Sequence, residues 1–153
     1  MIATAMSVCK AFFRGSDIYV VASAKTVHGI YQDSEPFFKL SQPVSSQELG
    51  QTVLQALASY REKVPGKTFI RGVKQPPDPF LTFAGFKSWG AFERGARHFS
   101  ISSKGTEVEI MPSVPGEQGG YLHQPARAVR CHGQPEQIGG CLLAQADSNA
   151  ATS

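Results

Sequence analysis

The sequence predicts one α+β domain in which a central antiparallel sheet carries two main helices. Its 153 residues are 41% hydrophobic and 18% charged, which is typical of a globular domain that buries a core without disulfides or metals. Short runs of β-branched and apolar residues recur through both halves of the chain. One segment of helical length closes each half, at about residues 46–63 and 135–146.

The first half is expected to begin with a strand at Asp17–Lys25, because its sequence DIYVVASAK is apolar and β-branched enough to be buried. The segments His28–Asp33 and Pro36–Leu40 are expected to form two further strands beside it. A helix is predicted over Ser46–Lys63, because a serine can cap its first turn and its leucines and valine share one face. Pro65 cannot continue that helix and marks its end.

A proline-rich connection at Gln75–Pro79 separates the halves, since prolines favour extended backbone. Beyond it, Ser88 can cap a short helix from Trp89 to about Ala96. The segments His98–Ser103 and Thr106–Pro112 predict a hairpin, because apolar residues alternate with glutamates in TEVEI after a Lys-Gly turn.

The chain is expected to end with two short strands and a helix. The strands are predicted at Tyr121–His123 and Ala126–Arg130, and the helix at Pro135–Ala146, where proline suits the first turn. Residues 147–153 are small and polar, and we predict a disordered tail there. Residues 1–153 together are therefore interpreted as a single domain.

The two halves, about residues 11–65 and 88–146, resemble copies of one β-β-β-α unit. Two pairs of short motifs indicate this duplication: AFFRG at 11–15 with AFERG at 91–95, and Leu49-Gly50 with Ile138-Gly139. Glycine inside a helix costs about 1 kcal/mol relative to alanine. Its presence in both helices therefore predicts a close approach of each helix to the sheet.

Charge and cysteine content indicate a cytoplasmic protein. The net charge is +3 and the 15 basic residues are scattered, whereas a nucleic-acid-binding protein usually clusters them on one face. The three cysteines, Cys9, Cys131 and Cys141, are an odd number and no secretory signal precedes them, which favours a reducing compartment. Apolar runs are far shorter than the roughly 20 residues of a membrane-spanning helix, so we expect no membrane partner.

The soft side chains of the second half do not match a metal site. Their spacing fits neither of the usual zinc patterns, although four residues could act as ligands: His123, Cys131, His132 and Cys141. Cys131 and His132 are adjacent, so on a strand they would point to opposite faces. We therefore predict no metal and no cofactor.

Catalytic motifs are also missing from the sequence. Cys9 with His28 or His98 is the candidate nucleophile–base pair, but no flanking residues match a nucleophile motif. The glycine-rich segment 116–120 lacks the Gly-Lys-Ser/Thr ending of a phosphate-binding loop. We predict that the protein is not an enzyme and has no small-molecule substrate. Three or more buried titratable groups converging in one deep cleft would indicate catalysis instead.

Residues 85–96, GFKSWGAFERGA, resemble a motif of the immunity proteins of bacterial contact-dependent growth inhibition systems, the CdiI type. In that motif a Lys-Ser-Trp step opens a short helix, and an aromatic residue, a basic residue and a glycine follow. Three looser segments agree with the family pattern, namely an Ile-x-Pro step, a glycine-rich turn before an aromatic residue and a Glu-x-Ile-Gly step, at residues 110–112, 119–121 and 136–139. The likeness spans about residues 11–146.

The resemblance implies a small cytoplasmic protein that binds the C-terminal toxin domain of a partner CdiA protein, often a nuclease, and blocks its active site. It implies neither a cofactor nor catalysis. Exposed loops are expected to supply the contacts. Predicted exposure selects six candidate partner-binding residues: Asp33, Glu35, Asp78, Glu117, Tyr121 and His123.

Two other functions stay open at this stage. A nucleic-acid-binding module would use the basic and aromatic segment 86–97 and would bind in a salt-sensitive way. A small hydrolase would lose turnover when Cys9 or His28 is replaced. We expect a toxin domain, and not nucleic acid, to be the partner.

Overall fold

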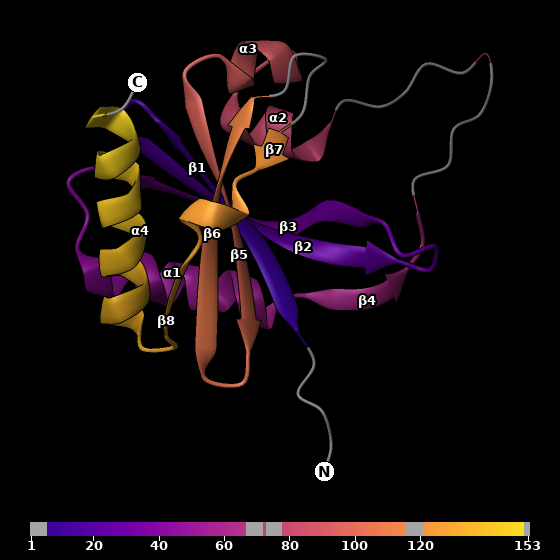
Figure 1. Cartoon of the computed structure of the whole chain (residues 1–153). Helices are drawn as coiled ribbons and strands as arrows, with labels where there is room; N and C mark the ends of the chain where they lie inside the picture. Colours follow the sequence, from indigo (N-terminus) through magenta and orange to yellow (C-terminus); the bar gives the residue numbers. More distant parts are fainter. Residues whose placement is uncertain (1–5, 67–71, 73–77, 116–120, 152–153) are drawn as a thin grey trace.

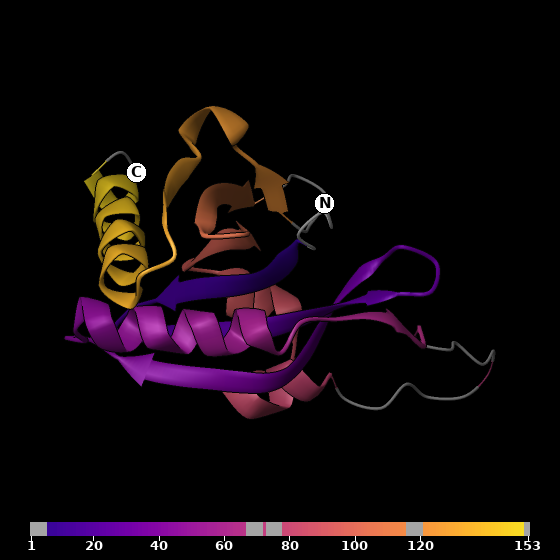
Figure 2. The same cartoon turned by 90° about the horizontal axis from the view of Figure 1, so that it is seen from below.

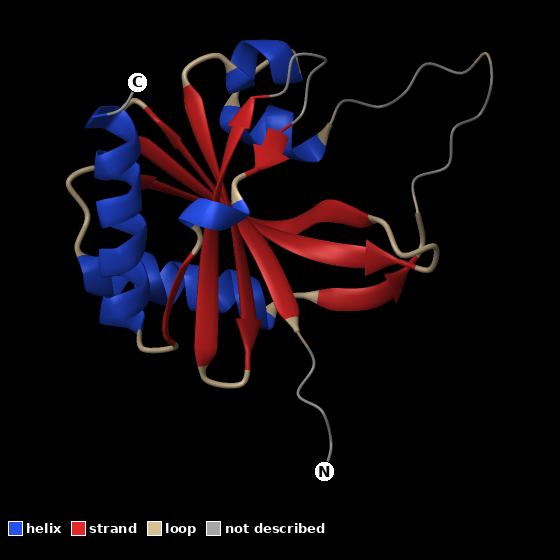
Figure 3. Ribbon diagram, in the orientation of Figure 1, coloured by secondary structure: helices blue, strands red, loops and turns tan. Residues whose placement is uncertain are grey.

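The computed structural model describes residues 6–66, 72, 78–115 and 121–151. Within these residues, eight strands form one sheet in the order β3-β2-β1-β5-β6-β7, with β4 paired to β2 and β8 paired to β6 (Figure 3). Every pairing is antiparallel except the parallel one between β4 and β2. The strands are β1 Ser7–Arg14, β2 Asp17–Thr26, β3 Tyr31–Ser41, β4 Arg61–Val64, β5 Ala96–Lys104, β6 Glu107–Pro115, β7 Tyr121–His123 and β8 Val129–His132. The predicted α+β class is confirmed.

Two long helices, α1 Ser46–Ala58 and α4 Pro135–Ala151, pack against each other and cover one face of the sheet (Figures 1 and 2). The Ser45 hydroxyl caps α1 by accepting the backbone N–H of Glu48 at 3.0 Å. Alternate residues of the strands point at these helices and form the main core. Its fully buried large side chains are Ile18, Val20, Leu49, Phe99, Ile101, Ile110, Ile138 and Leu142.

The two helices meet at a pair of glycines. A Cβ on Gly50 would lie 1.7 Å from the carbonyl oxygen of Pro135, and a Cβ on Gly139 would lie 1.9 Å from that of Ser46. Each glycine is the fifth residue of its helix and touches the first residue of the other helix. The predicted close approach therefore exists, but its partner is the opposite helix and not the sheet.

Two short helices, α2 Pro79–Ala84 and α3 Trp89–Glu93, cover part of the second face of the sheet (Figure 1). Asp78 caps α2 by accepting the backbone N–H groups of Phe80 and Leu81. A second, aromatic core lies beneath these helices and contains Phe12, Tyr19, Val21, Phe80, Leu81, Phe92 and Ala96. The covered part of the second face is therefore apolar.

The helix predicted to reach Lys63 ends at Ala58, and Arg61–Val64 forms β4 instead. The pairing of β1 with β2 stops at Cys9 and Ala22, so β1 leaves the last four residues of β2 without a partner on that edge. Segment Arg61–Val64 pairs with that edge through Ala24 and Thr26. A long-range pairing has overridden the local helical pattern.

Other boundaries also differ from the sequence prediction. The strands predicted at 28–33 and 36–40 are one strand, β3, whose register shifts between its pairing to Val21 and to Ala22. Helix α3 ends at Glu93 and not Ala96, which begins β5. A 3₁₀ turn at 125–127 and β8 replace the strand predicted at 126–130. Helix α4 continues to Ala151, beyond the end predicted at Ala146. The disordered tail predicted over residues 147–153 stays a prediction.

Each half has a series of strands followed by a long helix. Three strands and a helix, β1-β2-β3-α1, are followed later by β5, β6, the short β7 and β8, and α4. The AFFRG and AFERG motifs do not correspond, because residues 11–14 lie in strand β1 and residues 91–93 in helix α3. The helix glycines do correspond in position. The duplication itself stays a prediction.

Candidate binding groove on the open face of the sheet

Helices α2 and α3 leave part of the second face of the sheet uncovered, and the side chains there are polar. Strand alternation places Lys10 of β1 and Ser100 of β5 directly opposite each other on this face. Two residues further along these strands, on the same face, Phe12 of β1 lies opposite His98 of β5. His98 in turn lies opposite Ser113 of β6, and Ser113 lies opposite His123 of β7. The centre of the sheet thus presents donors and imidazoles where a core would present aliphatic groups.

Four of these side chains, those of Lys10, His98, Ser100 and His123, line a hollow of about 450 Å³, which we call the central groove. Its walls are apolar at Met6, Val8 and Met111, and its polar groups come from β1, β2, β3, β5 and β7. The ten residues that line it are Met6, Val8, Lys10, Ser23, Tyr31, His98, Ser100, Ser102, Met111 and His123. The groove is therefore concave and rich in hydrogen-bond donors.

Lys10 is held in place by an ion pair with Asp33 of β3. The side chains of Lys10 and Asp33 are 30% and 14% exposed, so this pair is more protected from water than an ordinary surface pair. The Lys10 ammonium also lies 5.9 Å from the centre of the Phe12 ring. Asp33 thus positions the one lysine or arginine that lines the central groove among the described residues.

His98 forms the buried end of the groove. It is 6% exposed, and its ring centre lies 5.1 Å from that of Phe12 and 6.3 Å from that of His123. Burial lowers the pKa of His98 to about 3, with smaller contributions from the charge of Lys10 and from His123. His98 is therefore a neutral imidazole at physiological pH.

His123 is exposed at the rim and shares a hydrogen bond of 3.0 Å between its Nδ1 and the Ser113 Oγ. Ser113 lies opposite both His98 and His123 in the sheet register. The bond fixes the His123 ring against β6. His123, one of the predicted partner-binding residues, thus lies at the groove as an ordered side chain.

A second hollow of about 420 Å³, the side hollow, adjoins the central groove and shares Lys10 and Tyr31 with it. Asp33 and Asp78 both line the side hollow. Asp78 already caps α2, and its other carboxylate oxygen accepts the Trp89 Nε1–H at 3.3 Å. Asp78 therefore has a structural role that sequence reasoning did not assign to it.

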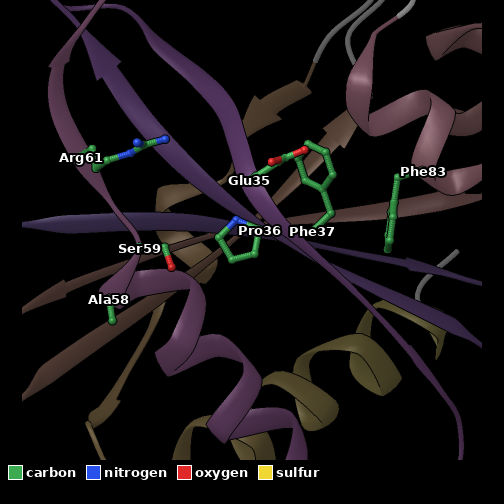
Figure 4. Close-up of a pocket in the computed structure, with 7 residues that line it drawn as sticks. All are labelled: Glu35, Pro36, Phe37, Ala58, Ser59, Arg61 and Phe83. Atoms are coloured by element: carbon green, nitrogen blue, oxygen red, sulfur yellow. The ribbon is translucent and has the colours of Figure 1, made fainter.

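Glu35 lies elsewhere, in an edge hollow of about 760 Å³ between β3, the end of α1, β4 and α2 (Figure 4). Arg61 faces this hollow from β4 and donates a hydrogen bond to the Ser34 Oγ at 3.2 Å. Phe83 of α2 lines its other side, is 44% exposed and contacts Phe37 at 5.7 Å between ring centres. The predicted residues therefore fall on two separate surfaces.

Of the six predicted residues, the structure brings Asp33, Asp78 and His123 together around Lys10 and places Glu35 apart. Tyr121 lies in β7, where its backbone pairs with Pro115, and Glu117 lies outside the described residues. Sequence reasoning missed Lys10 because it did not predict β1. It also missed a set of groove residues that alternate with apolar ones in HFSISS: His98, Ser100 and Ser102.

The candidate nucleophile–base pair does not form. Cys9 belongs to the core beneath the helices, whereas His98 lies on the other face of the sheet and His28 is exposed after β2. Burial raises the pKa of the Cys9 thiol far above its usual range. Among the residues that the structure describes, no group of three or more His, Cys, Asp or Glu side chains could hold a metal ion.

The segment 86–97 does not present a stacking platform. Phe92 is fully buried, Phe86 and Trp89 pack against the aromatic core, and the Arg14 guanidinium lies over the Phe86 ring at 4.5 Å. Arg97 points to the helix side of the sheet, where it donates a hydrogen bond to the carbonyl of Ala146 in α4. The basic and aromatic groups of this segment therefore do not share one face. No helix in the described part of the chain is both long and apolar enough to span a membrane.

Comparison with known proteins rests on structure. No family model and no curated protein matches the sequence. A protein of unknown function from Neisseria meningitidis has the same fold, with a TM-score of 0.69 and 18% identity over 92% of this chain and 93% of that one. A chain of the CdiA-CT/CdiI toxin and immunity complex from Yersinia pseudotuberculosis has a TM-score of 0.64 and 15% identity, over 91% of this chain and 94% of that one. At these identities the likeness shows a shared fold.

Proposed function

We propose that this chain is an immunity protein, which binds the C-terminal toxin domain of a cognate CdiA-type effector and neutralises it. The observation that carries the proposal is the uncovered, hollowed half of the sheet, with ordered polar groups at its centre. The motif at residues 85–96 and the fold shared with a chain of a toxin and immunity complex support it. The cytoplasm is the proposed site of action.

Apolar side chains at the edge of the groove suit it to a protein partner. Ile30 and Tyr31, after β2, are 64% and 47% exposed, and Met6 beside them is 45% exposed. Binding with a nanomolar dissociation constant requires a binding free energy of about −12 kcal/mol. Such binding usually buries about 1,600 Å² of surface and depends on a few aromatic anchors. Tyr31 is the aromatic anchor that we propose.

Binding accounts for the groove better than catalysis does. His98 is the one titratable side chain lining the central groove that is buried, among the residues described. Lys10 is paired with Asp33, and the exposed His123 is bonded to Ser113. Three buried groups converging on a substrate would favour an enzyme, and this arrangement falls short of that condition.

Co-expression rescue tests the proposal. The gene of an immunity protein should directly follow the gene of a large exported toxin, and this chain should restore growth to cells that express the C-terminal domain of that toxin. Ser100→Arg fills the groove and should abolish rescue and co-purification, whereas Gln51→Arg on the exposed face of α1 should retain both. Thermal unfolding checks that both variants fold. Killing in the presence of the wild-type protein, with no complex on co-purification, would refute the proposal.

A further inference from the structure

We infer that the central groove receives a carboxylate, the side chain of an aspartate or glutamate of the toxin domain. The inference rests on the proposed function and names the chemistry by which the partner is recognised. It comes from the donors that the groove presents, from the ion pair that positions its cation, and from its apolar walls.

The lining of the central groove is rich in donors and contains no carboxylate. Its polar groups are one ammonium, two imidazoles and four hydroxyls, from Lys10, His98, His123, Ser23, Tyr31, Ser100 and Ser102. A carboxylate has two oxygens with about four lone-pair positions and no donor when ionised. It is therefore the protein side chain that best complements this lining, and charge-assisted hydrogen bonds to it are the stronger kind.

Lys10 can bind a partner carboxylate without leaving Asp33. An ammonium carries three N–H donors, and the pair with Asp33 requires one of them. Ser100, directly opposite Lys10 in the register, places a hydroxyl beside the same position. Asp33 lines the side hollow and not the central groove.

The surroundings of His98 also favour an incoming negative charge. Lys10 of β1 and His123 of β7 both face His98. Burial is the main cause of the lowered pKa of His98, and these two side chains lower it further. A carboxylate near Lys10 would offset the positive potential of its ammonium. The same potential makes a basic partner side chain a poor fit.

One cation is too few for a nucleic acid. In the part of the chain that the structure describes, Lys10 is the one lysine or arginine that lines the groove, whereas a phosphate backbone is usually bound by several. Beyond the lining, the Lys25 Nζ lies 5.5 Å from the centre of the Tyr31 ring, and Arg130 is paired with Glu107 and Glu109 at 3.5 and 3.2 Å. Met6, Val8 and Met111 add apolar walls that suit a single side chain of a protein.

The test is a titration of the purified toxin domain into variants of this chain by calorimetry. Lys10→Gln should weaken the complex at least tenfold, and Lys39→Gln, which removes an exposed lysine 3.9 Å from Asp17, should leave the affinity within twofold. Asp33→Asn removes the carboxylate that positions Lys10 and should weaken the complex less than Lys10→Gln does. A basic partner group would reverse that result, because Asp33 would then be its acceptor.

Two further measurements separate recognition from folding. The double variant Lys10→Gln/Asp33→Asn removes both charges of the pair, leaves no unpaired buried ion and should still bind at least tenfold more weakly. Each Asp and Glu of the toxin domain is then changed to Asn or Gln. One of these changes should weaken the wild-type complex and cause no further loss with Lys10→Gln, as expected for a coupled pair.

The outcomes distinguish the inference from the function beneath it. A tight wild-type complex that Lys10→Gln weakens less than twofold would overturn the inference that the groove binds a carboxylate. The immunity proposal would not be affected by that result. Salt-sensitive binding of a 20-nucleotide single-stranded RNA that Lys10→Gln abolishes, with toxin binding unchanged, would also overturn it. Absence of any wild-type complex would remove both proposals.

Discussion

The close contact between α1 and α4 leads to opposite predictions for alanine substitutions at two adjacent glycines, Gly139 and Gly140. In Gly139→Ala, the new Cβ would lie 1.9 Å from the carbonyl oxygen and 2.7 Å from the carbonyl carbon of Ser46. Real Cβ atoms essentially never approach closer than 3.0 Å, so the helices must separate by about 1.1 Å. These are backbone atoms, which cannot rotate away as the end of a flexible side chain can.

The cost of that separation exceeds the gain in helix propensity. Overpacking a core typically costs about 1–3 kcal/mol, and a clash between backbones belongs at or above the upper end of that range. Replacing glycine by alanine inside a helix returns about 1 kcal/mol. We therefore expect Gly139→Ala to lower the free energy of unfolding by about 2 kcal/mol, and the melting temperature by about 4–8 °C.

Gly140→Ala is the matched control. It makes the same chemical change one residue later in the same helix, where the nearest atom to the new Cβ is the Ser46 Oγ at 3.8 Å, an ordinary contact. This variant should gain up to about 1 kcal/mol from helix propensity alone. The assay is urea unfolding followed by circular dichroism, with the slope compared between variants. If Gly139→Ala were as stable as the wild type, or if both variants shifted in the same direction, the packing argument would be refuted.

Three further predictions concern single side chains. The pKa of His98 is about 3 in the folded state and near 6.5 in the unfolded state, so the unfolded chain binds more protons between these pH values. The free energy of unfolding should therefore fall by up to about 1.4 kcal/mol per pH unit as the pH drops from 6.5 towards 3. His98→Asn should reduce this pH dependence, as measured by urea unfolding at several pH values. Asp78→Ala should lower the free energy of unfolding by about 1–2 kcal/mol in the same assay, because it removes the α2 cap and the Trp89 hydrogen bond. An unchanged free energy of unfolding would contradict this role of Asp78. A maleimide reagent should modify Cys131 and Cys141 well before the buried Cys9 by mass spectrometry, and equal rates would show that Cys9 is accessible.

Local patterns determined much of the fold. The alternation of TEVEI predicted the hairpin of β5 and β6, and the serine cap with its following leucines predicted the start of α1. The DIYVVASAK segment predicted β2. Each of these signals is contained within a few residues, because caps, turns and strand alternation are set by near neighbours along the chain.

Long-range pairing determined what the local patterns did not. Strand β1 and the strand at Arg61–Val64 form because neighbouring strands offer them hydrogen bonds, and the sequence prediction missed both. The helix glycines were predicted to mark a close contact, but only the packing shows that each meets the other helix.

The groove depends most strongly on that pairing. Asp33, Lys10 and His123 come from β3, β1 and β7, and only the order and register of the sheet bring them to one face. Composition and exposure selected Asp33 and His123 as surface groups, yet Lys10 becomes visible only when β1 is placed at the centre of the sheet. Cross-strand neighbours far apart in sequence are set by a register that no local segment encodes.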